Sequence, residues 1–381
     1  MKGFVKQRSE GSSWTAFWET RDPATGKRKQ HSKAGFTTKG AAQKHLNVVV
    51  GSVTTGDWRK DEPITVKQLL LEHWFPAQRS RSLRPSTLAS YKGAIEWYIV
   101  PSLGGRKVAA LTPADVSGLV ENMRTAVSAK GRRGLSARTA QVAVVTLKAA
   151  TAWANANGML SRDPLIGVAP PRRESKPMKS WNSTEARAFL THVHDDRLEV
   201  AWALLLTRPL RRGELAGLRW DAVNFVDGTI QITRTRISVN GKAMDSTPKT
   251  ASGARTIPLD AQLVSLLRSH EKQQKTERLR AGEAWQGIGH VIANELGEPY
   301  HPDYFGDRFE DLVKASGLSR IRLHDTRHTA CSLMLASGVS VKVVQELAGH
   351  SSPAITLSLY AHTTPSMGRD AGAALSASLL S

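Results

Sequence analysis

The chain has 381 residues, 40% of them hydrophobic, which is enough for two or three globular domains. Its 53 Lys and Arg against 33 Asp and Glu give a formal charge of +20, which favours a polyanionic partner over an unspecialised basic protein. One cysteine, Cys331, excludes an internal disulfide framework and a cysteine-based zinc site, and the lack of a membrane-length apolar stretch predicts a soluble cytoplasmic protein.

Residues 1–64 are predicted to form a small basic module. Residues 14–20 are rich in strand-forming side chains, residues 22–26 supply turn chemistry, and residues 27–32 are predicted to form a second strand. A short helix is expected to follow, ending near Leu46. Because the major groove admits a two-stranded ribbon, the basic residues around these strands favour DNA binding over a merely solvated surface.

Residues 65–165 are predicted to form four helices. Apolar side chains at helical spacing begin at Val66 and mark the first helix. Ser86, Thr112 and Ser136 are predicted to cap the other three. The aromatic residues of this segment are expected to lie in its core and not to stack on bases.

The rest of the chain is predicted to be a linker followed by a mainly helical region. Residues 166–178 are rich in proline and arginine and are expected to be extended. From residue 179 onward, apolar helical runs dominate, and residues 228–233 and 255–257 are predicted to be strands that flank a basic hairpin.

Two basic motifs and a late tyrosine indicate chemistry on a phosphodiester. Arg211 lies in the run Leu-Arg-Arg-Gly-Glu-Leu, and His324 and Arg327 lie in Leu-His-Asp-Thr-Arg-His. His350 follows an Ala-Gly pair, and Tyr360 stands ten residues later. Arginine binds phosphate oxygens with two parallel hydrogen bonds, histidine donates hydrogen bonds or moves protons, and tyrosine supplies an oxygen nucleophile. The pattern predicts metal-free attack that joins the chain covalently to DNA.

Individual residues near these motifs have other interpretations. His324 and His328 stand four apart, as zinc ligands on a helix do, but the helical zinc motif requires glutamate where Asp325 stands. Asp325 is expected to cap a helix, Glu214 to orient an arginine, and His328 to support its helix or Arg327.

Together the motifs resemble those of the tyrosine recombinases, the family of phage integrases and Xer-type resolvases. That family has arginines in Leu-Arg-Xaa-Gly-Glu-Leu and His-Xaa-Xaa-Arg-His motifs, a later Leu-Gly-His motif, here with Ala348 as its first residue, and then a tyrosine. Its lysine lies on a β-hairpin before a strand like the one at residues 255–259. The residues that match its catalytic set are Arg211, Lys249, His324, Arg327, His350 and Tyr360.

The resemblance implies a mainly α fold with small β elements. It implies an arm-binding β-sheet with a helix at residues 1–64, a helical core-binding domain at 65–165, a linker at 166–178 and an α+β catalytic domain at 179–381. The apolar tail after Tyr360 is expected either to fray or to dock on a neighbouring protomer.

The resemblance also implies a reaction and its partners. Tyr360 would attack the phosphate and Lys249 would protonate the leaving 5′-oxygen, giving a 3′-phosphotyrosine and then a Holliday junction, with no cofactor and no metal. The implied partners are double-stranded attachment sites of core and arm type, three further copies of the chain in a tetramer, and a host bending protein and an excision factor. The implied location is the nucleoid in a bacterial cytoplasm, without a membrane partner.

The N-terminal module favours the integrase of a temperate phage or integrative element, because Xer-type resolvases lack such a module and a type IB topoisomerase would lack it too. One departure from the family is Pro209, where relatives usually carry glycine. Proline fixes φ, so it is expected to stiffen or misplace the turn that carries Arg211. Pro209 is the single feature that supports a non-catalytic DNA-binding protein on the same scaffold.

Overall fold

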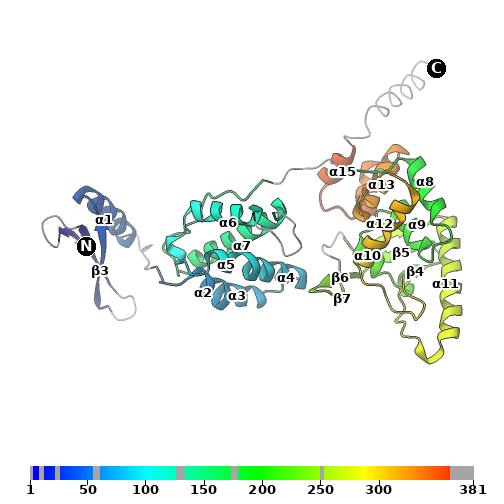
Figure 1. Cartoon of the computed structure of the whole chain (residues 1–381), viewed down its shortest axis with the longest axis horizontal. Helices are drawn as coiled ribbons and strands as arrows, with labels where there is room; N and C mark the ends of the chain where they lie inside the picture. Colours follow the sequence, from blue (N-terminus) through cyan, green and yellow to red (C-terminus); the bar gives the residue numbers. More distant parts are fainter. Residues whose placement is uncertain are drawn as a thin grey trace, which may run out of the picture. The chain divides into compact units, whose positions relative to one another are not determined.

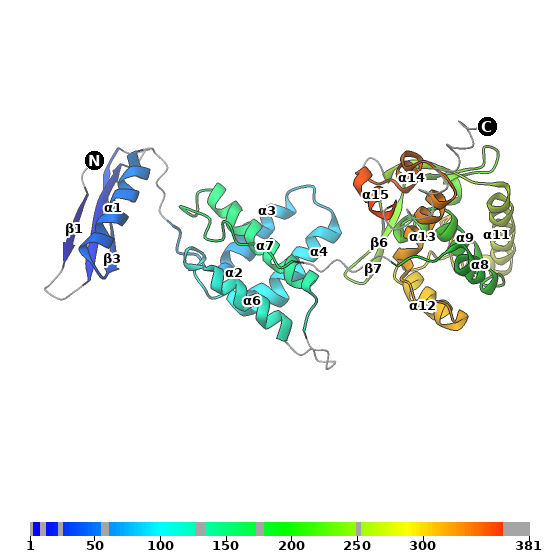
Figure 2. The same ribbon diagram turned by 90° about the horizontal axis from the view of Figure 1, so that it is seen from above.

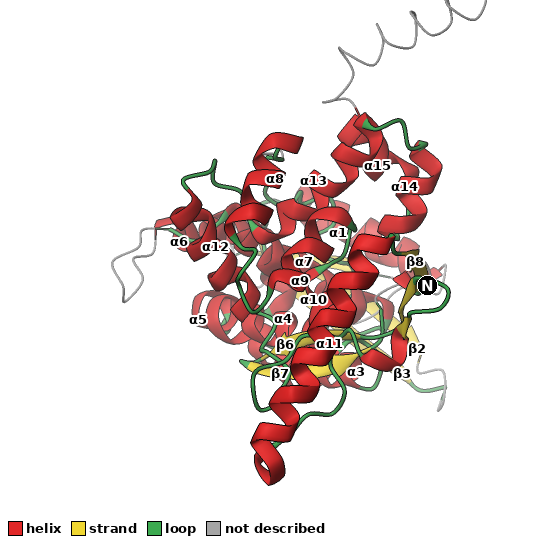
Figure 3. Ribbon diagram, turned by 90° about the vertical axis from the view of Figure 1, so that its right-hand side faces the viewer, coloured by secondary structure: helices red, strands yellow, loops and turns green. Residues whose placement is uncertain are grey.

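The computed structural model describes residues 3–7, 13–21, 26–54, 61–125, 134–172, 179–248 and 253–360 (Figure 1). The chain divides into two compact units, residues 1–174 and 175–381. Helices dominate the described residues, and the strands among them form three small sheets (Figure 3). The predicted fold class is therefore confirmed. No helix in the described ranges is both long enough and apolar enough to cross a membrane.

The N-terminal part is a three-stranded antiparallel sheet covered by one helix (Figure 2). Its elements are β1 (Phe4–Gln7), β2 (Trp14–Arg21), β3 (Arg28–Phe36) and α1 (Lys39–Thr54). Leu46 and Val49 of α1 pack on Ala16 and Trp18 of β2. The predicted two-stranded ribbon is thus confirmed, and β1 adds a third strand that the sequence did not predict. The helix continues past Leu46, because Val49 extends its apolar side.

The other face of this sheet is open and basic. Successive strand residues point to opposite faces of the sheet. Because Ala16 and Trp18 face α1, Phe17 and Arg21 point away from it, and so do the residues that pair with them on β1 and β3. Phe4 stacks on Phe17 there, with ring centroids 4.9 Å apart. Lys6, Arg21 and Arg28 are exposed on the same face.

Four helical segments make up the described part of residues 61–172, as predicted. They comprise α2 (Val66–Gln68), η1 (Leu69–Trp74), α3 (Phe75–Arg79), α4 (Pro85–Ala94), η2 (Ile95–Ile99), α5 (Val100–Leu103), α6 (Pro113–Thr125) and α7 (Ala137–Ala156), with a 3-10 turn η3 (Val108–Ala110). Thr112 and Ser136 cap α6 and α7 as expected. The predicted cap at Ser86 is wrong, because Pro85 already occupies the first helical position, where its missing N–H costs nothing.

Two of these helices contain a widened π-helical turn before a proline. The Phe75 N–H donates to the carbonyl of Leu70, and the Val100 N–H donates to that of Ile95, five residues back in each case. Pro76 and Pro101 follow at once. Proline has no N–H and its ring crowds the carbonyl four residues earlier, so the preceding turn widens.

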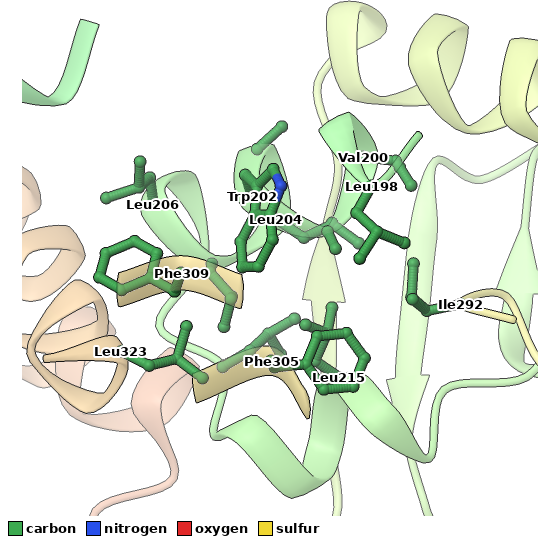
Figure 4. Close-up of a cluster of buried hydrophobic side chains, with 14 of the residues drawn as sticks. Leu198, Val200, Trp202, Leu204, Leu206, Leu215, Ile292, Phe305, Phe309 and Leu323 are labelled. Carbon is green, nitrogen blue, oxygen red and sulfur yellow. The ribbon is translucent and has the colours of Figure 1, made fainter. Parts of the chain in front are cut away.

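The second unit is built around a core of aliphatic and aromatic side chains (Figure 4). The helix α9 (Glu199–Thr207) is buried on nearly every side, as the apolar run between its two ends predicts, and its Trp202 packs on Phe189 and Phe309. The surrounding helices are α8 (Ser183–His192), α10 (Arg212–Ala216), α11 (Ala261–Ala281), α12 (Tyr304–Ser316), α13 (Leu323–Ala336), α14 (Val341–Ala348) and α15 (Pro353–Tyr360), with 3-10 turns η4 (Trp220–Ala222) and η6 (Gly282–Ala284).

A small sheet carries the predicted hairpin. Its order is β4 (Val223–Asn224), β5 (Thr229–Ile232) and β8 (Arg255–Pro258), all antiparallel. Between β5 and β8 the chain forms the hairpin β6 (Thr235–Val239) and β7 (Lys242–Ser246). Asn240 and Gly241 have φ of 51° and 75°, which a tight hairpin turn requires.

Candidate active site

The start of α13 is held by a buried carboxylate. Asp325 accepts hydrogen bonds from the backbone N–H of Arg322 at 2.9 Å and from its guanidinium at 2.9 and 2.7 Å. Burial alone would raise the pKa of Asp325, but the hydrogen bonds and charge of Arg322 lower it. Asp325 therefore caps the helix as expected, and it orients the turn from which His324 and Arg327 project.

Arg327 is buried and faces backbone carbonyls. Only 2% of it is exposed, and its two terminal nitrogens donate to the carbonyl oxygens of Pro209 and Ala348. Burial, together with the charge of Arg211, lowers the pKa of Arg327 to about 10. The side chain is thus still a cation at neutral pH.

Arg211 reaches the same place from the N-terminal end of α10. It donates to Glu214 at 2.7 Å and to the carbonyl of Gly349 at 2.8 Å, and 38% of its side chain is exposed. The turn that contains Pro209 lies against Arg327, because the carbonyl of Pro209 accepts a hydrogen bond from the Arg327 guanidinium. Proline lacks an N–H but keeps its carbonyl, so this role is open to it.

A third arginine, Arg255, was missed as a site residue. The sequence predicts only that Arg255 begins a strand, which is β8. Its guanidinium binds both oxygens of Glu214, at 3.1 and 2.9 Å, and its Nε donates to the carbonyl of Leu347 at 2.6 Å. Burial alone would raise the pKa of Glu214, but the bonds and charges of Arg255 and Arg211 lower it. The strand Arg255–Pro258 gives no sign of this role in the sequence, because Glu214 lies 41 residues away.

The carbonyl oxygens of Leu347, Ala348 and Gly349, here called the α14 carbonyl row, gather all three arginines. Each oxygen accepts from a different guanidinium, that of Arg255, Arg327 or Arg211. The last carbonyls of a helix lack partners within it and form the negative end of its dipole. The end of α14 therefore stabilises three positive charges at one point, and Gly349, with φ 61° and ψ 45°, turns the chain away from it.

His350 follows this turn and links it to α15. Its Nδ1 lies 2.9 Å from Oγ1 of Thr356, and both residues are buried. Burial, with the charges of Arg327 and Arg211, lowers the pKa of His350 to about 4. His350 is therefore neutral at physiological pH.

His324 and His328 form a pair on α13. Their rings meet edge to face with centroids 5.2 Å apart. His324 is exposed by its surface area, yet its partial burial and the charges of His328 and Arg327 lower its pKa to about 4. Burial also lowers the pKa of His328, whose Nδ1 is buried without a hydrogen-bond partner. Both rings are neutral at pH 7.

Tyr360 is the last residue of α15, four positions after Thr356. Lys249 and the tail after Tyr360 lie outside the described residues, as do residues 173–178 of the predicted linker. The structure thus brings together Arg211, Arg327 and His350, with His324 beside Arg327.

Gly217 allows α10 to approach the hairpin. A Cβ atom added there would lie 2.7 Å from the carbonyl carbon of Thr235 and 2.8 Å from the backbone N of Arg236. Because these are backbone atoms, Gly217→Ala is expected to shift α10 against β6, destabilise the fold by about 1–3 kcal/mol and slow any reaction that uses Arg211. Chemical denaturation measures the first effect. Gly306→Ala, on a helix with open space around it, is the control and should be neutral or slightly stabilising. Equal effects of the two changes would refute this packing argument.

The lowered histidine pKa values predict a pH dependence of stability. The unfolded chain binds protons on these residues below its ordinary histidine pKa of 6.5, whereas folded His324 and His350 resist protonation until about pH 4. The melting temperature is therefore expected to fall as pH is lowered from 6.5 to 5, a window above the carboxylate titrations. In His350→Gln, which keeps a hydrogen-bonding side chain but does not titrate, the fall should be shallower. An unchanged slope would contradict the burial of a neutral His350.

Three families match successive parts of the chain. The Phage integrase family matches residues 182–367, the Arm DNA-binding domain matches residues 4–50, and the Phage integrase N-terminal SAM-like domain matches residues 68–123.

Individual relatives agree with these matches. A tyrosine recombinase XerC-like protein of Caldanaerobacter subterraneus subsp. tengcongensis is 26% identical over 339 residues, covering 84% of this chain and 82% of that protein. An integrase of Saccharopolyspora erythraea is 24% identical over 365 residues, covering 82% of each.

Solved structures show the same fold. The Tn1549 transposon integrase in complex with transposon right end DNA matches with a TM-score of 0.65 and 21% identity, covering 82% of this chain and 100% of that one. A lambda integrase tetramer bound to a Holliday junction matches with a TM-score of 0.57 and 18% identity, covering 93% and 94%. The chain belongs to the phage integrase family and is a tyrosine site-specific recombinase.

Proposed function

We propose that this recombinase is the integrase of a temperate phage or integrative element, joining an attachment site on the element to one on the host chromosome. The observation that carries the chemistry is the convergence of Arg211 and Arg327 on the α14 carbonyl row, beside His350. Relatives named integrase, among them the ICEBs1 integrase of Bacillus subtilis, 25% identical over 228 residues, support the biological assignment.

The two arginines would bind the non-bridging oxygens of the scissile phosphate. Negative charge grows on these oxygens in the transition state, and fixed guanidinium donors stabilise it without reorganising. The Arg211 side chain is partly exposed and so accessible to DNA. The Arg327 guanidinium is fixed by hydrogen bonds to the carbonyls of Pro209 and Ala348. His324 and His350 are neutral, so each is able to donate a hydrogen bond or accept a proton.

Tyr360 would be the nucleophile. Its oxygen bonds to phosphorus, its proton passes to a neutral histidine or water, and the bond to the 5′-oxygen breaks as Lys249 protonates that oxygen. Thr356 binds His350 and lies one helical turn before Tyr360, so both positions share one side of α15. The 3′-phosphotyrosine keeps the bond energy, and a 5′-hydroxyl from another duplex then displaces the tyrosine, producing a Holliday junction.

Different parts of the chain would bind different parts of the DNA. We assign residues 1–64 to arm DNA, 65–165 to one face of the core site, 166–178 to a linker and 179–381 to catalysis. Separate buried clusters in the sheet module, the helical segment and the second unit support this division. The open sheet face with Lys6, Arg21 and Arg28 is suited to a phosphate backbone, which favours an integrase over an Xer-type resolvase.

The working form would be a tetramer on double-stranded DNA, like the lambda integrase tetramer bound to a Holliday junction, and it would be assisted by a host bending protein and an excision factor. It would act on the nucleoid in a bacterial cytoplasm.

The test is incubation of the wild-type chain with a nicked core site in the presence of EDTA, followed by denaturing electrophoresis. A covalent protein–DNA band supports the proposed chemistry, and binding without a band supports the non-catalytic alternative. A second reaction supplies two attachment sites with or without flanking arm sequences. Recombination that requires the flanking arm sequences identifies an integrase, and recombination that proceeds equally well without them identifies a resolvase.

A further inference from the structure

Arg255 is poorly placed to contact DNA, since most of its donors already bind protein atoms. Its side chain is 7% exposed. Its Nε donates to the carbonyl of Leu347, one terminal nitrogen donates to Glu214 and to the carbonyl of Gly253, and the other donates to Glu214. Arginine has five N–H groups, and these contacts use four of them. Any contribution to the reaction must therefore pass through its partners.

Those partners hold the proposed catalytic arginines. Glu214, which is 1% exposed, binds Arg255 with both oxygens and also accepts from the backbone N–H and the guanidinium of Arg211. On its other side, Arg255 binds the first oxygen of the α14 carbonyl row, whose next two oxygens bind Arg327 and Arg211. Arg255 thus joins β8, α10 and α14 at the point where the arginines converge.

The pair between Arg255 and Glu214 also affects how strongly Glu214 attracts Arg211. One buried carboxylate, that of Glu214, is shared by two guanidinium groups. Without Arg255, the undivided charge of Glu214 would draw Arg211 into a full two-bond pair and compete with a phosphate for its donors. The carbonyl of Leu347 would also lose its partner, which loosens the end of α14.

We propose that Arg255 is a positioning residue for strand cleavage: by saturating Glu214 and fixing the end of α14, it keeps Arg211 available and correctly spaced from Arg327. This inference rests on the proposed function.

The test compares three variants of the full chain. Arg255→Met removes every contact, and Arg255→Lys keeps a charge but not the planar fork. Arg197→Met is the matched control, because Arg197 also binds a carboxylate, Glu277 at 2.6 Å, and a backbone carbonyl, that of Ala293 at 2.8 Å, outside the proposed site. Single-turnover cleavage of the nicked core site, affinity for an intact site and melting temperature are measured for each.

Arg255→Met is expected to slow cleavage by about 100-fold, the cost of a displacement of about 1 Å in a reacting group, while affinity for the site is retained. Arg255→Lys should be intermediate, and Arg197→Met should lower the melting temperature but cleave at the wild-type rate. Wild-type cleavage by folded Arg255→Met, or equal slowing in Arg197→Met, would overturn the inference. If Arg255→Met does not fold, wild-type cleavage by Arg255→Lys would overturn it. Failure of the wild-type chain itself to cleave refutes the proposed function instead.

Discussion

Replacing Tyr360 by phenylalanine is expected to abolish covalent attachment to DNA and to leave binding of the core site unchanged. The substitution removes one oxygen, that of the proposed nucleophile. The contact between Thr356 and His350 that anchors α15 does not involve the removed atom, so the fold should persist. Denaturing electrophoresis with a nicked core site measures the adduct, and a gel shift measures binding.

Tyr304→Phe is the matched control for this change. Tyr304, the first residue of α12, stacks on Tyr300, which precedes the helix, with ring centroids 4.5 Å apart, and has no part in the proposed chemistry. It should form the adduct at the wild-type rate. An adduct formed by Tyr360→Phe would show that the nucleophile is another residue.

Replacing Arg327 by lysine is expected to slow cleavage by about 10²–10³-fold, the usual loss when one transition-state donor is removed. Lysine keeps the positive charge but cannot hold the carbonyls of Pro209 and Ala348 while it donates to a phosphate. A buried carbonyl left without its partner should also cost about 1–3 kcal/mol of stability. Single-turnover rates and denaturation curves measure both effects.

Arg320→Lys provides the comparison for this variant. Arg320 pairs with Glu310 at an exposed position, where a salt bridge contributes little. Both the cleavage rate and the stability should stay at wild-type values. Cleavage by Arg327→Lys at the rate of Arg320→Lys would mean that charge alone is sufficient at position 327.

Much of the site could be predicted because its residues lie in short motifs. His324 and Arg327 are three apart on one helix, so their shared face follows from helical geometry. Glu214 and Asp325 each stand three residues after the arginine they bind, which is the spacing of a helix cap. The all-apolar run of α9 likewise predicted a buried helix.

The remaining parts depend on contacts that sequence spacing does not reveal. Arg255 binds Glu214 from 41 residues away, and the α14 carbonyl row consists of backbone atoms that no side-chain pattern marks. The fixed φ of Pro209 predicts a stiffened or misplaced turn, but it does not predict that the carbonyl of Pro209 accepts a hydrogen bond from Arg327. β1 is only four residues long, too short for its alternation to stand out.

The central claim is that Tyr360 becomes joined to DNA, and the most direct measurement is the identity of the linked amino acid. The adduct formed with a nicked core site is digested with protease and nuclease, and the peptide that carries the nucleotide is sequenced by mass spectrometry. A 3′-phosphonucleotide on the hydroxyl of Tyr360 is expected. A nucleotide on any other residue, or a linkage through a 5′-phosphate, would contradict it.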